Sequence, residues 1–252
     1  MNDIKIGILG FGEVGEAVFN VYTNSGEFPL VNDPYKGRND DLSIVNILNV
    51  CIPYTDEKFI HTVSEFVKKC ANIELVIIHS TIVLGVVESI SDILEGVHIV
   101  HSPVRGVHPN LAEGIQTFVK YVGFSKGNDD AGIAAKKHLE TIGIKTTITT
   151  CTNTVLMKLL STTYYGMCIA FTEDMGKLCD KESADFDMIS DWNVTYNEGY
   201  KILGKPNVTR PILKRIKDGK TIGGHCVLPN AKLLKQMYPE CTAWDYVLKY
   251  SG

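Results

Sequence analysis

A glycine-rich segment near the amino terminus has the spacing of a phosphate-binding turn. Its residues are Gly10-Phe11-Gly12-Glu13-Val14-Gly15. The segment directly follows an apolar run at residues 6–9 and opens an amphipathic stretch at residues 17–22. In such a turn the first glycine permits the bend, the second lets backbone N–H groups approach a diphosphate, and the third lets a helix pack on the strand. The six residues are therefore predicted to bind a dinucleotide at the positive end of a helix dipole.

An acidic residue follows at the position where such units bind ribose. Asp33 ends the next predicted strand, 23 residues after Gly10, and an acid about 20 residues beyond the turn accepts hydrogen bonds from the ribose hydroxyls. Its carboxylate would repel a 2′-phosphate, which favours NAD over NADP, although Lys36 and Arg38 could offset that repulsion. We therefore predict NAD as the cofactor. The alternative is a glycine turn in an α/β protein that binds no dinucleotide.

Lys158 lies inside an otherwise apolar stretch in the second half of the chain. Oxidation of an alcohol by hydride transfer needs a group that accepts the hydroxyl proton and a donor that stabilises the developing alkoxide. Desolvation lowers the pKa of a lysine, so Lys158 could serve either need near neutral pH. The alternative is a lysine whose stem covers apolar surface while its ammonium reaches water.

Cys226 and His108 are two further candidates. Cys226 follows Gly223-Gly224-His225, and its thiolate could add to an aldehyde, from which a second hydride would leave to give a thioester. An ordinary buried cysteine is the alternative. His108 follows Arg105 in a polar loop at the edge of the sheet where ligands collect; it could act as a general base beside an arginine that binds an anion, or be a solvated loop histidine. Neither belongs to a group with metal-ligand spacing, so no metal is expected.

The elements that must position these residues follow from the hydrophobic pattern. Over residues 4–148, short β-branched runs alternate with amphipathic stretches, which predicts a Rossmann-type, doubly wound, mainly parallel α/β sheet. The predicted strands are residues 4–9, 29–32, 44–52, 74–79, 98–101, 121–124 and 145–148. A helix is predicted at residues 57–70, which carry apolar side chains on one face.

The hydrophobic pattern of the sequence changes after Thr150. A long buried helix is predicted at residues 153–179 and another at residues 184–203, in an all-helical carboxyl-terminal domain. We therefore expect an NAD-binding Rossmann domain at residues 1–150 and a helical domain for substrate binding and dimerisation at residues 151–252. The long helix is too apolar to face water on all sides, so we expect it to pair in a homodimer.

Composition excludes several other classes of protein. The 252 residues are 44% hydrophobic and carry a formal net charge of −4, which leaves no cationic excess for nucleic acid or an anionic membrane. No apolar run approaches the roughly 20 residues of a membrane span, and the amino terminus has no secretory signal. Seven scattered cysteines without a CxxC pair indicate reduced thiols and a cytoplasmic protein. The expected partner is a small-molecule substrate.

Four segments occur in the order and spacing of a known family. They are Cys51-Ile52-Pro53-Tyr54, Ser80-Thr81-Ile82-Val83, Lys158 with the residues that follow it, and Gly223-Gly224-His225-Cys226. Together with the glycine turn, they resemble the nucleotide-sugar 6-dehydrogenases of the UDP-glucose and GDP-mannose type, within the 6-phosphogluconate dehydrogenase-like superfamily. The resemblance covers most of the chain. The family's carboxyl-terminal nucleotide-binding domain has no counterpart here, so the resemblance implies a truncated member.

The resemblance implies roles for particular residues. Cys226 matches the family's nucleophile, Lys158 its catalytic lysine and Thr81 a catalytic threonine. The resemblance also implies that Thr81, Pro53 and Tyr54 contact the cofactor. Thr162 stands where the family has an asparagine, and Asn230 where it has an aspartate. The acids that follow Ser-Pro in the family are replaced by Val-Arg-Gly-Val-His at residues 104–108, and one of those acids assists thioester hydrolysis.

These observations together predict an NAD-dependent dehydrogenase that oxidises a hydroxyl of a small polar or anionic, sugar-like substrate. One hydride transfer is expected, because the helpers of the second oxidation are substituted. One alternative is a two-electron β-hydroxyacid-type dehydrogenase, which would not need Cys226. The other alternative is an NAD-binding sensor or subunit with little or no catalysis.

Overall fold

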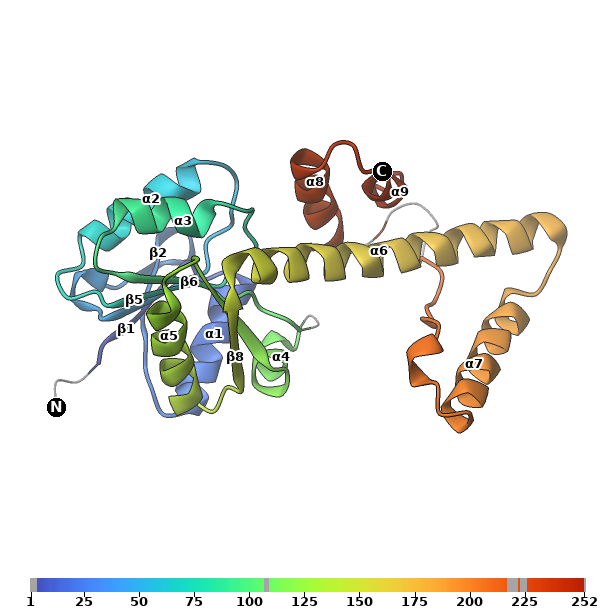
Figure 1. The fold of residues 1–252 in the computed structure, drawn as a ribbon, viewed down its shortest axis with the longest axis horizontal. Helices are drawn as coiled ribbons and strands as arrows, with labels where there is room; N and C mark the ends of the chain where they lie inside the picture. Colours follow the sequence, from blue (N-terminus) through green and yellow to red (C-terminus); the bar gives the residue numbers. More distant parts are fainter. Residues whose placement is uncertain (1–3, 107–108, 217–221, 223–225, 252) are drawn as a thin grey trace. The chain divides into compact units, whose positions relative to one another are not determined.

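The computed structural model describes residues 4–106, 109–216, 222 and 226–251. Contacts between Cα atoms divide the chain into two compact units, Met1–Lys158 and Leu159–Gly252. In Figure 1 the strands all belong to the first unit, whereas the second is drawn with helices. No helix of the described ranges is long and apolar enough to cross a membrane.

The strands that the structure describes form one eight-stranded sheet in the order β3-β2-β1-β4-β5-β6-β7-β8. Their bounds are β1 Ile6–Leu9, β2 Leu30–Asp33, β3 Arg38–Asn39, β4 Ile47–Val50, β5 Leu75–Ile78, β6 His98–His101, β7 Lys120–Phe124 and β8 Thr146–Thr150. The adjacent strands β2, β1, β4, β5 and β6 are parallel to one another. Strand β3 pairs antiparallel with β2, β7 pairs antiparallel with β6, and β8 is parallel to β7. The predicted fold class, a doubly wound and mainly parallel sheet, is confirmed.

Helices cover both faces of this sheet, so its central strands β1, β4 and β5 are buried along their whole length, as expected for parallel sheets. The helices of the unit are α1 Glu13–Asn24, α2 Lys58–Lys68, α3 Val86–Ile93, α4 Leu111–Thr117 and α5 Asp129–Thr141. One hydrophobic cluster joins α1, α4 and α5 to the sheet, and α2 and α3 lie against each other (Figure 1). The predicted helix at residues 57–70 is confirmed as α2.

The chain between β2 and β4 forms two short turns and one short strand. A 3-10 turn, η1 Pro34–Lys36, ends at Gly37 with φ of +69°, and β3 then returns antiparallel to β2. Next, Asp41 caps the 3-10 turn η2 Leu42–Ile44 by accepting a hydrogen bond from the backbone N of Ser43 at 2.9 Å. The strand predicted at residues 44–52 is therefore shorter, because its first residues belong to this turn. A two-residue strand is too short to produce a hydrophobic alternation, so the sequence did not indicate β3.

The described residues of the second unit form helices joined by turns and irregular segments, and no strand is found among them. Helix α6 Cys151–Glu182 begins in the first unit and continues into the second, where α7 Phe186–Ile202, η3 Pro206–Val208, α8 Val227–Met237 and α9 Ala243–Leu248 follow. The side chain of Asp185 starts α7 by accepting hydrogen bonds from two backbone N–H groups of its first turn. The two long helices and the helical carboxyl-terminal part predicted from the sequence are confirmed. The prediction that the first of them is buried is wrong for this chain by itself, since Phe171 and Leu178 of α6 are 60 and 57% exposed.

Candidate active site

The predicted cofactor residues lie on loops at one edge of the sheet. Because β2, β1, β4, β5 and β6 are adjacent and parallel, the loops that follow them meet at the carboxyl edge, where open α/β sheets bind ligands. These loops carry residues 10–15 after β1, Asp33 at the end of β2, Pro53 and Tyr54 after β4, Thr81 after β5, and residues 102–106 after β6. The structure therefore places these predicted cofactor residues, all of them described, at one edge of the sheet.

The glycine turn has the geometry of a diphosphate cradle. Gly10 has a φ of +91°, in the left-handed region that favours glycine. A Cβ at Gly15 would overlap the carbonyl oxygen of Gly10, whereas a Cβ at Gly12 would meet nothing within 4 Å. Gly12 is the N-cap of α1 and has no side chain that could cap the helix, so the space beside the start of α1 is not filled by a side chain of this residue. This arrangement suits an anion at the start of the helix.

Asp33 connects β2 to the glycine turn. Its Oδ2 accepts a hydrogen bond from the backbone N of Phe11 at 2.7 Å, and a carboxylate has further acceptor capacity for ribose hydroxyls. Arg38 is the register partner of Asp33 on β3, and its guanidinium lies 4.9 Å from the centre of the Phe11 ring. The acid that disfavours a 2′-phosphate and a cation that attracts one therefore lie side by side.

The loops after β4 and β5 are fastened to each other. The hydroxyl of Ser80 donates to the carbonyl of Ile52 at 2.5 Å. Tyr54 packs edge-on against Phe59 of α2, with 5.6 Å between the ring centres. Pro53 is exposed, whereas Tyr54 and Thr81 are half-buried. Residues from neighbouring loops are thus held in place for contact with a bound ligand.

Lys158 reaches the same edge from α6. Its Nζ donates to the carbonyl of Val104 in the loop after β6 at 2.8 Å, and the side chain is half-buried. Arg105 in this loop donates to the carbonyl of Val119, and its guanidinium lies 5.3 Å from the centre of the Phe118 ring. Arg105 therefore fastens the loop to the segment before β7. His108, the candidate base, lies outside the described residues.

The sequence did not indicate a second lysine at this loop. Lys120 of β7 is only 5% exposed, and its Nζ donates to the carbonyl of Ser102 at 2.8 Å and to that of Pro103 at 3.4 Å. Burial, assisted by the charges of Lys158 and Arg105, lowers the pKa of Lys120 to about 7. The available signal was a single lysine between apolar residues at 118–124, directly before the strand predicted at residues 121–124.

Two buried histidines contact backbone carbonyls at the start of the loops after β5 and β6. His79 is 3% exposed and contacts the side chain of Asn49 at 2.8 Å and the carbonyl of Ser102 at 3.1 Å. His101 is fully buried, and it contacts the Ser80 carbonyl at 3.1 Å and the Thr154 hydroxyl at 2.8 Å. Burial lowers the pKa of both imidazoles, that of His101 to about 3. Both histidines are therefore neutral in the folded protein.

These histidines predict acid-sensitive stability. An unfolded histidine has a pKa near 6.5, so below that pH the unfolded chain binds protons that the folded chain does not, and stability falls with pH. Between pH 7 and pH 5, each fully neutral buried histidine should cost about 2 kcal/mol. Urea unfolding at both values measures this loss. In His101→Gln the loss of unfolding free energy between pH 7 and pH 5 should be smaller by about 2 kcal/mol. A loss equal to that of the unchanged protein would contradict the prediction.

In the second unit, Cys226 and Asn230 share the start of α8. Cys226 is the half-buried N-cap residue, and Asn230 lies one turn later, 3% exposed. The side-chain Nδ2 of Asn230 has no hydrogen-bond partner among the described residues. Gly223, Gly224 and His225, which precede Cys226, lie outside the described residues.

Helix α8 begins against α6 near Thr162. Gly166 lies one turn after Thr162, and a Cβ at Gly166 would overlap a methyl group of Val227. The absence of a side chain at Gly166 therefore permits the close approach of α8. Within the second unit, this contact brings the residue after Cys226 to the part of α6 that carries the half-buried Thr162.

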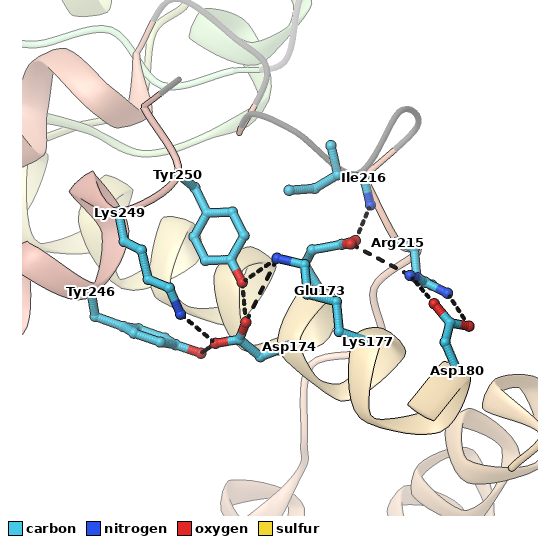
Figure 2. A network of polar contacts seen from close by, with 9 residues as sticks. All are labelled: Glu173, Asp174, Lys177, Asp180, Arg215, Ile216, Tyr246, Lys249 and Tyr250. Carbon is cyan, nitrogen blue, oxygen red and sulfur yellow. Dashed lines mark hydrogen bonds and ion pairs between the residues drawn. The ribbon is translucent and has the colours of Figure 1, made fainter. Parts of the chain in front are cut away.

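Acidic side chains of α6 hold the chain on both sides of Cys226 (Figure 2). Before it, the 1% exposed carboxylate of Glu173 accepts from the backbone N of Ile216 at 3.2 Å and lies 3.5 Å from the Arg215 guanidinium. Arg215 also forms two hydrogen bonds to Asp180, at 3.0 and 2.9 Å. This cluster fixes the segment that leads into residues 217–226.

After Cys226, a second cluster fixes α9. Asp174 accepts from the hydroxyl of Tyr246 at 3.0 Å and from that of Tyr250, and the Lys249 Nζ lies 3.6 Å from its carboxylate (Figure 2). The Tyr250 carbonyl accepts from the backbone N of Ile222 at 3.1 Å. The chain before and after Cys226 is thereby anchored to adjacent residues of α6.

The second unit also contains a mainly apolar cavity of about 460 Å³. Its lining includes Phe171 of α6, Phe186 of α7, Tyr246 of α9 and Arg210. The Arg210 guanidinium lies 3.8 Å from the centre of the Tyr196 ring. None of the predicted site residues lines this cavity.

Comparison with known proteins places this fold among the nucleotide-sugar dehydrogenases. The chain superposes on UDP-D-ManNAc dehydrogenase from Pyrococcus horikoshii with a TM-score of 0.76 and 17% identity, over 98% of this chain and 68% of that one. UDP-N-acetyl-mannosamine dehydrogenase Cap5O from Staphylococcus aureus gives 0.70 and 14%, over 98% and 68%. A UDP-glucose dehydrogenase from Pyrobaculum islandicum gives 0.70 and 13%, over 98% and 67%.

At these identities the comparisons show the fold, and the resemblance expected from the sequence is confirmed at that level. Neither a family model nor a curated protein sequence matches the chain. The chain spans about two thirds of the length of the structures that it resembles.

Proposed function

We propose that the protein is an NAD-dependent dehydrogenase that oxidises a hydroxyl of a small polar, sugar-like substrate. One observation carries the proposal: the glycine turn with Asp33 and the ammonium group of Lys158 contact loops at the same edge of one parallel sheet. Such an edge combines a site for a dinucleotide with a group that exchanges protons. The solved structures with this fold are named as dehydrogenases of nucleotide sugars.

The residues of the glycine turn fit the cofactor. The open space at Gly12 and the first N–H groups of α1 would receive the diphosphate, and Asp33 would accept hydrogen bonds from the adenosine ribose. When bound, NAD supplies a nicotinamide ring that accepts a hydride. Asp33 favours NAD, whereas the neighbouring Arg38 favours NADP. The ratio of the dissociation constants for NAD and NADP measures which effect is larger.

Lys158 would handle the proton of the reaction. In its neutral form, the amine accepts the hydroxyl proton while the carbinol C–H leaves as a hydride, so that the alcohol loses two electrons and becomes a carbonyl. The resulting ammonium then returns its proton to solvent. The Val104 carbonyl, which accepts a hydrogen bond from Nζ, orients the group in both charge states.

Assay of the purified protein with a panel of nucleotide sugars and hydroxy acids tests the proposal. NADH formation with any of them supports a dehydrogenase. Calorimetric binding of NAD without turnover across the panel would instead favour the sensor or subunit. That alternative is motivated by Asn230 and Thr162, which stand where the resembling family has an aspartate and an asparagine. Turnover of hydroxy acids alone would favour the β-hydroxyacid type.

We expect one NADH per substrate oxidised, and Cys226→Ser should retain most of the turnover. The reason is that a second oxidation needs a thiolate with acidic helpers, and Asn230 supplies an amide instead of a carboxylate. Stoichiometry from absorbance at substrate exhaustion measures this number. Two equivalents, with a trapped thioester on Cys226 that the serine variant lacks, would establish the four-electron mechanism.

We also propose that α6 and α7 form the interface of a homodimer. Large apolar side chains are exposed there, such as Phe171, Leu178 and Trp192 at 60, 57 and 69%, and exposed apolar surface of this kind marks association sites. Light scattering should give twice the chain mass, and Phe171→Glu with Leu178→Glu should give monomers. Ile133→Glu on α5, also exposed, is the matched control. A monomeric unchanged protein at micromolar concentration would disprove the interface.

A further inference from the structure

The mainly apolar cavity of the second unit contains a charged side chain. The cavity volume of about 460 Å³ lies within the range of small-molecule sites, which is about 300 to 1,000 Å³. Among the described residues that line it, Arg210 is the charged one, and most of the others are apolar or aromatic side chains of α6, α7 and the segment after η3. An apolar cavity with few polar groups is typical of a site for a small organic molecule.

Arg210 has aromatic rings and a carbonyl as neighbours, and no carboxylate of the described residues forms an ion pair with it. Its guanidinium lies 3.8 Å from the centre of the Tyr196 ring and donates to the carbonyl of Val208 at 3.2 Å. Arg215, five positions later in the same segment, is instead paired with two carboxylates of α6. Because a guanidinium has five N–H donors, Arg210 keeps donors available for a ligand.

The position of Arg210 is fixed by α7. The side chain of Asn197 accepts a hydrogen bond from the backbone N of Arg210 and donates one to its carbonyl, each at 2.8 Å. The ring of Tyr196 lies against the guanidinium, a contact that a planar cation favours. The cation is therefore held in place before a ligand binds, which lowers the entropy cost of binding.

We propose that this cavity binds a small carboxylate with an apolar body, such as a medium-chain fatty acid. Its carboxylate pairs with Arg210, and its apolar part lies among the side chains of α6 and α7. The inference goes beyond the proposed function and does not rest on it, because none of the residues that carry that function lines the cavity.

The charge and the lining of the cavity select this class of ligand. One guanidinium matches the single charge of a carboxylate, and two of its parallel N–H groups match the two oxygens. A phosphate monoester carries a charge of about −1.5 to −2 at pH 7, so part of its charge would stay unpaired in apolar surroundings. A free sugar would lose hydrogen bonds to water that the apolar lining cannot replace.

Calorimetry with three probes that share one tail tests the choice of head group. The probes are octanoate, octanol and octylammonium. We expect octanoate to bind at least about tenfold more tightly than either of the others, because the tail is the same in all three and Arg210 attracts only the carboxylate. Equal affinities, or no binding of octanoate at millimolar concentration, overturn the proposal.

Arg210→Met should weaken the binding of octanoate by about ten- to a hundredfold, while octanol binds as before. Lys214→Met is the matched control, because it removes the same charge from an exposed position of the same segment that does not line the cavity. Its affinity for octanoate should equal that of the unchanged protein. An equal loss in both variants would indicate attraction at long range without a pair at Arg210, and it overturns the proposal.

A second variant covers the case in which Arg210→Met does not fold. Ser190 also lines the cavity, so Ser190→Phe fills part of the space while the charge of Arg210 stays. This variant should bind octanoate at least about tenfold more weakly. An unchanged affinity in the folded Ser190→Phe variant places octanoate elsewhere and overturns the proposal.

Alkylation of cysteines locates the bound probe. Cys168 is half-buried and lines the cavity, whereas Cys241 is half-buried and does not line it. Saturating octanoate should slow the reaction of Cys168 with N-ethylmaleimide severalfold and leave that of Cys241 unchanged. Protection of neither thiol, or of both to the same degree, overturns the proposal.

A second copy of the chain is the other occupant to be tested, because Phe171 belongs both to the proposed dimer interface and to the lining. Leu178→Glu weakens that interface at a residue outside the lining. Octanoate should bind this variant and the unchanged protein equally. Binding that appears only in the variant, together with its dissociation in light scattering, would mean that the second copy fills the cavity, and it overturns the proposal.

Discussion

Replacing Lys158 with methionine should lower kcat by about 10² to 10⁴, the usual contribution of a positioned acid or base, while the dissociation constant for NAD stays within about twofold. Methionine keeps the length and apolar stem of the lysine but cannot take up a proton. Because Nζ contacts the loop after β6 through the Val104 carbonyl, the loss falls on proton transfer and not on the glycine turn. Steady-state kinetics and an NAD titration measure the two effects.

Lys136→Met serves as the control, since it removes a half-buried lysine of α5 in the same unit that also donates to a backbone carbonyl, that of Thr146 at 3.4 Å. Its kcat should equal that of the unchanged protein. A Lys158→Met variant that keeps its kcat and its pH profile would remove Lys158 from the chemistry, and the proton acceptor would have to be sought elsewhere at the sheet edge. A fall in NAD affinity equal to the fall in kcat would indicate a structural role instead.

The backbone of the cofactor site could be predicted from the sequence because its determinants are local. Gly10 has a φ of +91°, which favours glycine, and a Cβ at Gly15 would overlap the carbonyl of Gly10, five positions earlier. The strands beside this turn are continuous, buried apolar runs. Asp33 follows at a distance set by one helix and one strand. Such features depend on short segments, and they leave a pattern that can be recognised before any tertiary contact is known.

The polar residues inside the unit could not be predicted in this way. Lys120 is buried by a loop that lies 18 positions away along the chain, and His101 contacts Thr154, which is 53 positions away. A lysine or histidine in a sequence looks the same whether water or a carbonyl surrounds its side chain. The acids of α6 show the same limit, since Glu173 and Asp174 are explained by partners up to 76 positions later.

These two kinds of residue also differ in what they contribute. The local pattern produces the glycine turn, a feature that many proteins with different reactions share. The distant contacts of Lys120 and Lys158 hold two amines at the loop after β6. The proposed reaction therefore depends on contacts that the sequence pattern did not reveal.

Gly12→Ala should weaken NAD binding by about ten- to a hundredfold, equivalent to about 1.4 to 3 kcal/mol, while the free protein loses at most about 1 kcal/mol of stability through the change of its N-cap residue. A Cβ at Gly12 meets nothing within 4 Å, and its φ of −75° suits alanine. The methyl group would nevertheless occupy the space through which the diphosphate approaches the N–H groups of α1. Calorimetric titration with NAD and urea unfolding measure the two quantities.

Two glycine variants make the comparison sharp. Gly15→Ala should lose stability, by about 1 to 3 kcal/mol, because its Cβ overlaps the carbonyl of Gly10. Gly199→Ala in α7, where a Cβ also meets nothing within 4 Å, should leave NAD binding unchanged. An added Cβ meets nothing within 4 Å at either position, so a loss of NAD affinity confined to Gly12→Ala indicates a ligand at the turn. Equal NAD affinity in Gly12→Ala and Gly199→Ala would therefore mean that no diphosphate binds at this turn.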